Sequence, residues 1–187
     1  MSYASETSPG FALKHIDKWL YKKNRNNSAR YILGEAGENP LVCVGINPST
    51  AEPNNLDRTL TNVKRFSELK GYDGWLMLNV YPQRSTDPNG LHMEMDKKLH
   101  SLNLKYISEH LSRYNKVEIW AAWGTLIRKR RYLCNALRDI VEGLEGVGVR
   151  WVTIGKVSKD GHPHHPLYLS HKSNVEIFDI VGYLRGL

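Results

Sequence analysis

Residues 41–50 read LVCVGINPST, an apolar run that stops at a polar turn. The run at residues 41–45 has the length and composition of a buried β-strand, and the Asn47-Pro48 pair after it is a turn signal. The same arrangement recurs downstream, where apolar runs occupy residues 75–80, 117–123 and 149–154. Each of these runs is followed by a proline, a glycine or a loop rich in His and Pro. The sequence therefore predicts four buried strands.

Segments with helical spacing of apolar residues separate these strands. We predict helices over residues 59–70, 91–114, 125–142 and about 173–184. Gly71 suits the C-cap of the first helix, and Thr125 suits the N-cap of the third. Strands that alternate with helices indicate parallel βαβ units with helices on both faces of the sheet. We therefore expect an α/β fold with three layers around a central, mainly parallel four-stranded sheet.

The chain before residue 41 is less regular. Apolar side chains at helical spacing predict a helix over residues 11–23, while residues 24–28 read as a loop and residues 31–33 as a short edge strand. The length of 187 residues suits one domain with a full core. We expect a single domain over residues 1–187, with a helical and edge-strand extension over 1–40 and a core over 41–184.

Composition excludes several classes of protein. A hydrophobic share of 41% argues against disorder, and no apolar run approaches the roughly 20 residues of a membrane span. Residues 1–10 lack the apolar stretch of a signal peptide, so we expect a cytoplasmic protein with no membrane partner. Its two cysteines, Cys43 and Cys134, are too few for a four-cysteine metal site, and we expect reduced core residues. The net charge of +7 favours polyanionic partners.

The chemically distinctive residues converge on one edge of the predicted sheet. In α/β sheets, ligands bind beyond the carboxyl ends of the strands. The segments predicted at those ends are residues 47–50 (NPST), 79–82 (NVYP), 123–125 (WGT) and 161–170 (GHPHHPLYLS). We therefore expect the functional site at this edge.

These segments resemble, in chain order, the motifs of the uracil-DNA glycosylase superfamily. Residues 45–48 (GINP) are similar to the water-activating motif, in the form used by the thymine- and mismatch-specific branch. Residues 76–79 (LMLN) resemble the strand whose terminal Asn reads the base. The remaining similarities are a helix start at Leu60-x-Asn62, the WG pair at residues 123–124, and residues 165–170 (HPLYLS). The last segment resembles HPSPLS, which holds the second catalytic residue and an intercalating Leu, and the whole resemblance covers about residues 41–184.

The chain also resembles a bacterial family without an assigned activity. The matching residues are 47–51 (NPSTA), Asp57, Thr59, 84–88 (RSTDP), 122–124 (AWG) and 160–168 (DGHPHHPLY). This second resemblance is closer, but it supplies no activity and leaves the substrate open.

The first resemblance implies an enzyme that extrudes a base from DNA and hydrolyses its N-glycosidic bond. Asn47 would orient the attacking water through its side-chain carbonyl; alternatively, it stabilises the turn before Pro48. His165 would donate a hydrogen bond to the departing base. Alternatively, His165 is a structural loop residue, or a metal ligand with His162, His164 and His171.

No carboxylate recurs at a metal-ligand interval beside these histidines, so we expect no metal and no cofactor. No lysine falls at a nucleophile position of the superfamily. The resemblance therefore implies a monofunctional glycosylase that leaves an abasic site in an intact strand. We expect the protein to act on duplex DNA as a monomer.

The residues that would recognise the base also have structural alternatives. Asn79 would pair with a pyrimidine edge, or it is a strand-end Asn bonded to the backbone. Ser49 stands where uracil-excising members carry a Tyr that crowds C5 of the pyrimidine. A C5-substituted base, such as hydroxymethylated or glucosylated cytosine of phage DNA, follows as the expected substrate, with antiviral defence as a hypothesis. Arg84 and Asp57 would contact a phosphate or a base substituent, or form a structural ion pair.

Two further groups of residues are candidates for DNA contact. Leu169, beside Tyr168, would fill the stack that the extruded base leaves, or it packs into the core. The basic run of Arg128, Lys129, Arg130 and Arg131 would contact phosphates, or it is a solvated helix face.

Two other functions remain open on the same residues. One is a nucleic-acid-binding module without catalysis, whose binding would survive loss of Asn47 and His165. The other is a hydrolase of free nucleosides or nucleotides, which would need neither a basic face nor an intercalating Leu.

Overall fold

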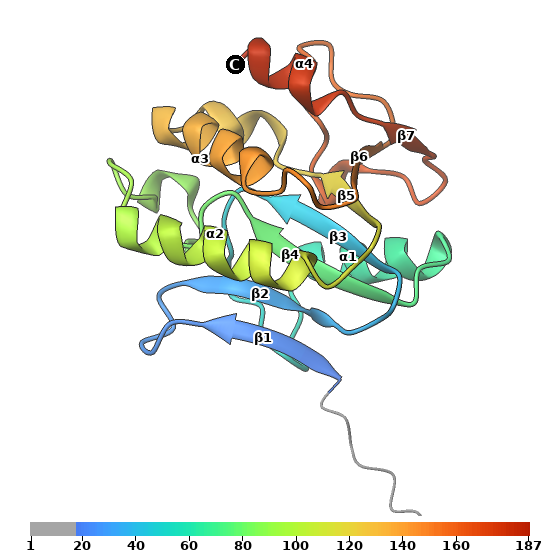
Figure 1. Cartoon of the computed structure of the whole chain (residues 1–187), viewed down its shortest axis with the longest axis horizontal. Helices are drawn as coiled ribbons and strands as arrows, with labels where there is room; N and C mark the ends of the chain where they lie inside the picture. The colour runs from blue at the N-terminus through green and yellow to red at the C-terminus, as the bar shows by residue number, and fades with distance from the viewer. Residues whose placement is uncertain (1–17) are drawn as a thin grey trace, which may run out of the picture.

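One mixed sheet runs through the computed structural model, which describes residues 18–187 (Figure 1). Its strand order is β1-β2-β4-β3-β5-β6-β7. The strands are β1 Trp19–Lys23, β2 Arg30–Glu35, β3 Pro40–Gly45, β4 Gly74–Asn79, β5 Val117–Ala121, β6 Val149–Ile154 and β7 Val175–Ile177. The α-helices are α1 Arg58–Leu69, α2 Lys97–Leu111, α3 Arg131–Glu142 and α4 Ile180–Arg185. Three short 3-10 helices are η1 Pro88–Gly90, η2 Gly124–Arg128 and η3 Pro166–Tyr168.

The predicted α/β class is correct, but the predicted four-stranded sheet is wrong. The four apolar runs do form neighbouring parallel strands, in the order β4-β3-β5-β6. Strands β1 and β2 extend this sheet on one side and β7 extends it on the other, all through antiparallel pairs. The result is a mixed sheet of seven strands.

The N-terminal prediction is wrong where the structure describes it. Residues 19–23 form a strand rather than a helix, while residues 11–17 of that predicted helix lie outside the described residues. Pairing with β2 overrides the helical spacing, and Trp19 and Leu20 pack on opposite faces of the sheet. Residues 31–33 belong to β2, which is an internal strand because β1 covers its outer side.

A helix prediction is confirmed where the structure has an N-cap residue at the predicted start of the helix. The predicted helix at residues 59–70 is confirmed as α1, with Asp57 Oδ1 accepting from the Leu60 N–H at 2.9 Å. The helix predicted over 91–114 is shorter, since Asp96 caps α2. The helix predicted over 125–142 breaks at Arg130, which is extended and whose guanidinium donates to carbonyls of the 89–92 loop. The last predicted helix, over 173–184, is instead β7 followed by α4.

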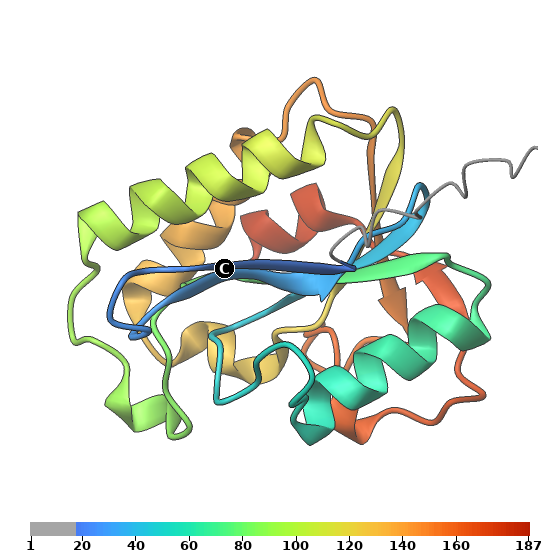
Figure 2. The ribbon, with the colours of Figure 1, turned by 90° about the horizontal axis from the view of Figure 1, so that it is seen from below.

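Helices cover both faces of the sheet (Figure 2). Helices α2, α3 and α4 lie on one face, where Trp123 and Trp151 join the larger hydrophobic cluster. Helix α1 lies on the other face, where Phe66 and Trp120 meet edge to face at 5.2 Å between ring centroids. These two apolar layers hold the strands of the sheet between them.

The direction of chain crossover reverses at β3. The chain passes from β3 through α1 to β4 on one side, and then through α2 and α3 to β5 and β6 on the other. Such a reversal opens a crevice at the carboxyl ends of two neighbouring strands whose following connections lead to opposite sides of the sheet. Here these strands are β3 and β5. The Asn47-Pro48 turn follows β3 and the Trp123-Gly124 pair follows β5, so both segments flank this switch point.

Among residues 18–187, no helix combines the length and the apolar character that crossing a membrane requires.

The pairing of β2 with β4 depends on Gly34. A Cβ at Gly34 would lie 2.1 Å from the main-chain oxygen of Trp75, which no side-chain movement relieves. We expect Gly34→Ala to lower the free energy of unfolding by about 3 kcal/mol, measured by chemical denaturation. Gly186→Ala is the control, because its Cβ would meet nothing closer than 3.5 Å. Equal stability of the two variants would contradict the β2–β4 pairing.

Candidate active site at the switch point of the sheet

His165 lies where the loop after β6 meets helix α1. Asn62 on α1 donates to the main-chain oxygen of Pro166 at 3.3 Å, which holds the loop against the helix. Gly124 has φ +61°, and a Cβ there would lie 4.0 Å from the Cβ of His165. The Trp123-Gly124 pair therefore gives the chain the left-handed turn that lets His165 approach the end of β5.

The ring of His165 has a defined donor. Its Nδ1 accepts from the Leu167 N–H at 3.4 Å, and in a neutral imidazole the proton then resides on Nε2. Burial lowers the pKa of His165, while the nearby charge of Asp57 raises it less. At neutral pH the ring is therefore uncharged and offers Nε2–H as a hydrogen-bond donor.

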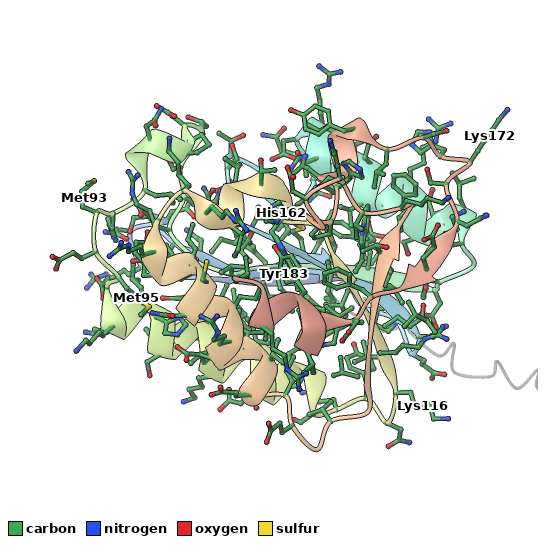
Figure 3. All side chains as sticks on the ribbon, turned by 90° about the horizontal axis from the view of Figure 1, so that it is seen from above. Met93, Met95, Lys116, His162, Lys172 and Tyr183 are labelled. Atoms are coloured by element: carbon green, nitrogen blue, oxygen red, sulfur yellow. The ribbon has the colours of Figure 1, made fainter. Side chains whose placement is uncertain are left out.

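His162 is held by residues from two other elements. Its Nδ1 lies 2.8 Å from the hydroxyl oxygen of Tyr183 on α4 (Figure 3). Trp123 Nε1–H donates to that oxygen at 3.0 Å. The hydroxyl accepts from Trp123, and we assign its own proton to a hydrogen bond donated to His162 Nδ1. The proton of the neutral ring therefore resides on Nε2.

The environment keeps both members of the His162–Tyr183 pair uncharged. Burial, and then the charge of Arg128, lowers the pKa of His162, while Asp160 raises it. Burial raises the pKa of Tyr183 to about 12. His162 is only 3% exposed, so this network orders the inner wall of the site.

The two histidines line one cavity of about 360 Å³, here called the histidine cavity. Trp123, Leu167 and Tyr168 are also part of its wall. Its volume lies within the range of roughly 300–1,000 Å³ typical of small-molecule sites. Two neutral N–H donors in such a space suit a ligand oxygen or ring nitrogen that carries, or gains, negative charge.

Asn47 has one side of its amide fixed. Its Nδ2 donates to the main-chain oxygens of Pro48 and Ser85, at 3.1 and 2.8 Å. Within residues 18–187 no group donates to Asn47 Oδ1, so this oxygen is available to accept from water. Such an arrangement is compatible with orienting a water molecule.

Ser49 lies in a different cavity from His165. This second cavity, about 460 Å³, is called the hydroxyl cavity and is lined by Asn27, Ser49, Thr50, Glu52, Arg84, Ser85 and Thr86. Arg84 donates to the main-chain oxygens of Ser49 and Ala51 and to the hydroxyl of Tyr21. Its guanidinium therefore fastens the loop after β3 to β1, with Glu52 as a loose ion-pair partner at 3.7 Å.

A buried arginine beneath this loop was not among the predicted site residues. Arg30 donates to the main-chain oxygen of Ala51 at 3.0 Å. Burial, and then the charge of Arg84, lowers the pKa of Arg30 to about 10, while Asp57 raises it. Asp57 thus lies near both Arg30 and His165, besides capping α1. An arginine inside an apolar run is the sequence signal that could have indicated Arg30.

Asn79 is entirely buried at the end of β4. With its amide nitrogen facing two carbonyls, Nδ2 donates to the main-chain oxygens of Asn47 and Leu78, both at 3.3 Å. Its own main-chain oxygen accepts from Asn103 at 2.9 Å. Asn79 therefore holds the Asn47 turn from below and exposes no surface to a ligand in this conformation.

The predicted DNA-contact residues separate into exposed and partly buried ones. Leu169 packs beside Gly155 against the α1-side cluster, whereas Tyr168 is 81% exposed and Leu167 is 40% exposed. Leu167, which the sequence prediction missed, lies in the same PLY segment and also lines the histidine cavity. The side chains of Arg128, Lys129 and Arg131 are exposed, while Arg130 is tied to the 89–92 loop.

The part of the chain that the structure describes contains no group of three or more His, Cys, Asp or Glu side chains placed to hold a metal ion.

A family model described as a protein of unknown function (DUF1643) matches residues 30–167. The chain belongs to the DUF1643 family. The DUF1643 match runs from β2 to η3 and includes Asn47, His162 and His165, whereas Tyr183 follows it. No curated protein and no solved structure matches the chain significantly.

Replacing Tyr183 with Phe removes the hydroxyl that donates to His162 and accepts from Trp123. A hydrogen bond to the neutral ring lowers its pKa, so we expect the pKa of His162 to rise in Tyr183→Phe, with burial still holding it down. When the pH is lowered, His162 of the variant is therefore protonated at a higher pH than His162 of the unaltered protein. Because Trp123 loses its acceptor, we also expect the unfolding free energy to fall by about 1–3 kcal/mol.

NMR titration of the histidine rings measures this pKa and the tautomer. Tyr168→Phe is the matched control, since the Tyr168 hydroxyl bonds to no described residue and its ring is exposed. An unchanged His162 titration in Tyr183→Phe would show that the hydroxyl does not orient the ring.

Proposed function

We propose that this DUF1643 protein is a monofunctional DNA glycosylase that hydrolyses the N-glycosidic bond of an extruded base. The observation that carries the proposal is the pair of neutral histidines, His162 and His165, in a base-sized cavity at the switch point of the sheet. Their fixed Nε2–H donors suit a leaving group on which negative charge develops. The motif resemblance to the uracil-DNA glycosylase superfamily supports the same reaction.

In this proposal His165, on one side of the switch point, acts on the leaving base, and Asn47, on the other side, acts on the attacking water. When the glycosidic bond breaks, its electron pair passes to the base, and a hydrogen bond from His165 stabilises that charge. Asn47 Oδ1 orients the water that adds to the sugar, and the proton of that water leaves to solvent. An amide is a weak base, but a sugar centre with cationic character requires little base strength.

Base extrusion is assigned to the exposed end of the His165 loop. Tyr168 and Leu167 project from η3 beside the histidine cavity, where apolar side chains can fill the stack that a base leaves. Arg128, Lys129 and Arg131 are exposed on η2 and at the start of α3. They supply positive charge for the phosphates of duplex DNA.

We propose that the protein works in the cytoplasm as a monomer.

The expected base is a pyrimidine with a polar substituent on C5. Ser49 leaves space where uracil-excising members of the uracil-DNA glycosylase superfamily place a Tyr ring, and Ser49 lines the hydroxyl cavity. Hydroxyl, amide, carboxylate and guanidinium groups line that cavity, a set that matches the hydrogen-bonding groups of a hydroxymethyl group or a sugar. Hydroxymethylated and glucosylated cytosines of phage DNA carry such groups, which supports a role in antiviral defence.

The excision proposal is tested with duplexes that carry single modified bases, followed by alkali cleavage at any abasic site. We expect Asn47→Ala to reduce turnover by orders of magnitude and His165→Ala to reduce it by about 10²–10³-fold. Excision by the unaltered protein should persist in EDTA, and the strand should stay intact until alkali is added.

Asn89→Ala, an exposed change on η1, is the control and should retain full turnover. DNA affinity measured on the same variants separates catalysis from binding. Full activity in Asn47→Ala or His165→Ala would show that the site is wrongly assigned. DNA binding without any excision would instead favour the non-catalytic module, and cleavage of free nucleosides alone would favour the nucleoside hydrolase.

The substrate is tested through Ser49 in a competition between duplexes with uracil, cytosine, hydroxymethylcytosine and its glucosylated form. We expect the bulky C5-substituted base to be excised fastest. Ser49→Tyr should abolish that activity by filling the space, whereas Ser49→Ala should retain it. Uracil excised fastest, or a bulky base still accepted by Ser49→Tyr, would contradict the C5 assignment.

A further inference from the structure

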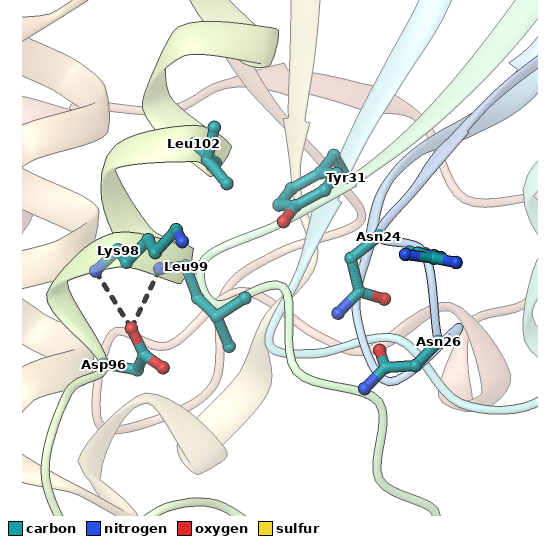
Figure 4. Close-up of a pocket in the computed structure, with 8 residues that line it drawn as sticks. Asn24, Asn26, Tyr31, Asp96, Lys98, Leu99 and Leu102 are labelled. Carbon is teal, nitrogen blue, oxygen red and sulfur yellow. Dashed lines mark hydrogen bonds between the residues drawn. The ribbon is translucent and has the colours of Figure 1, made fainter.

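A cavity of about 610 Å³ lies apart from the histidine and hydroxyl cavities, between the β1–β2 turn and the first turn of α2 (Figure 4). We call it the Tyr31 cavity. Asn24, Arg25 and Asn26 line it from the turn, and Asp96, Lys98, Leu99 and Leu102 line it from α2. The turn lies at the same edge of the sheet as the proposed active site, because Arg30 N–H donates to the main-chain oxygen of Pro82 beyond the end of β4.

The inner end of this cavity holds a buried donor without a partner. Tyr31 is 2% exposed, and within residues 18–187 its hydroxyl bonds to no group. The ring is held against Tyr106 at 4.8 Å between centroids, and its hydroxyl points into the space between Leu99 and Asn24 (Figure 4). A buried hydroxyl left unpaired is unfavourable, so a ligand acceptor at this position would be stabilised.

Apolar surface lies next to this hydroxyl. Leu99 and Leu102 face the cavity from successive turns of α2, opposite the β1–β2 turn (Figure 4). A ligand that combines an apolar body with a hydrogen-bond acceptor therefore suits this lining. A nucleobase has both properties.

The mouth of the cavity carries positive charge. Arg25 and Lys98 are exposed there and take part in no described ion pair. Asp96 is the carboxylate among the residues that line this cavity. It caps α2, since its Oδ1 accepts from the N–H groups of Lys98 and Leu99. Asn26 Oδ1 is bonded to Ser28, which leaves its Nδ2 as a further donor.

We propose that the Tyr31 cavity binds a nucleotide, with the base against Leu99 and Leu102 and the phosphate at Arg25 and Lys98. A base oxygen or ring nitrogen accepts from the Tyr31 hydroxyl. The nucleotide is either a free monophosphate or an unpaired unit of a DNA strand, because both offer the same chemistry. The site shares no lining residue with the proposed active site, so it goes beyond the excision proposal.

Calorimetric titration of the whole protein tests this site with two probes. The first is each of the four deoxynucleoside 5′-monophosphates, with inorganic phosphate and the unphosphorylated nucleosides for comparison, and the second is a short single-stranded oligonucleotide. We expect at least one nucleotide probe to bind more tightly than phosphate or nucleoside alone. Saturable binding of a monophosphate indicates a free nucleotide, whereas binding of the oligonucleotide alone indicates a DNA strand.

Variants locate the binding. Tyr31→Phe removes only the hydroxyl, and we expect about five- to tenfold weaker binding, as for one lost neutral hydrogen bond. Lys98→Ala should weaken binding and reduce its salt dependence. Lys105→Ala is the matched control, because it removes a lysine from the same helix outside the cavity, and its affinity should stay within about twofold.

Two measurements keep the result independent of folding and of the excision proposal. Tyr31→Phe should melt at the same temperature as the unaltered protein or higher, because the lost hydroxyl has no partner. His165→Ala should bind the nucleotide probe normally, even if excision is lost. The proposal is overturned if no nucleotide probe binds, if Tyr31→Phe binds as tightly as the unaltered protein, or if Tyr31→Phe melts at a lower temperature.

Discussion

Strand β3 is the constraint on which the rest of this protein depends. All of its residues from Pro40 to Gly45 are buried, and it pairs in parallel with β4 on one side and β5 on the other. Val42 and Val44 pack under α2 to α4, whereas Leu41 and Cys43 pack under α1. A buried backbone must form its hydrogen bonds within the sheet, so this strand has no freedom to slip. The position of the turn after Gly45 follows from it.

That turn is held mainly through its main-chain oxygens. Asn79 donates to the oxygen of Asn47, while Arg84 donates to those of Ser49 and Ala51, and Arg30 also donates to Ala51. Burying two guanidinium groups is costly, and the nearby charges of Asp57 and Glu52 offset part of that cost. The backbone is therefore fixed while Asn47 Oδ1 and the Ser49 side chain remain available to a substrate. In the proposed excision, which needs little base catalysis, such a rigid turn would hold the attacking water in position.

His162 and His165 are both uncharged, but different contacts orient their rings. His165 is oriented within its own loop, by the N–H two residues later. His162 depends on Tyr183 from the last helix and on Trp123 from the end of β5. The positive charge of Arg128 disfavours protonation of His162, as burial does for both rings. The site thus offers two uncharged donors beside exposed cationic side chains. In the proposed excision, the first would stabilise the leaving base and the second would attract the phosphate backbone.

The sequence by itself determined the α/β class, the four parallel strands, helix α1, and the gathering of the Asn47, Trp123 and His165 segments at the carboxyl edge. Buried strands need continuous apolar runs and turns need Pro, Gly or Asn, and both signals are local. The tertiary structure decided which segments became β1 and β7, since short edge strands take their conformation from the neighbour they pair with. It also decided that Leu169 is packed while Leu167 and Tyr168 are exposed, that Asn79 is buried beneath the turn, and that Tyr183 orients His162. These outcomes depend on contacts between residues far apart in the chain, and no local pattern in the sequence specifies which side chain meets which.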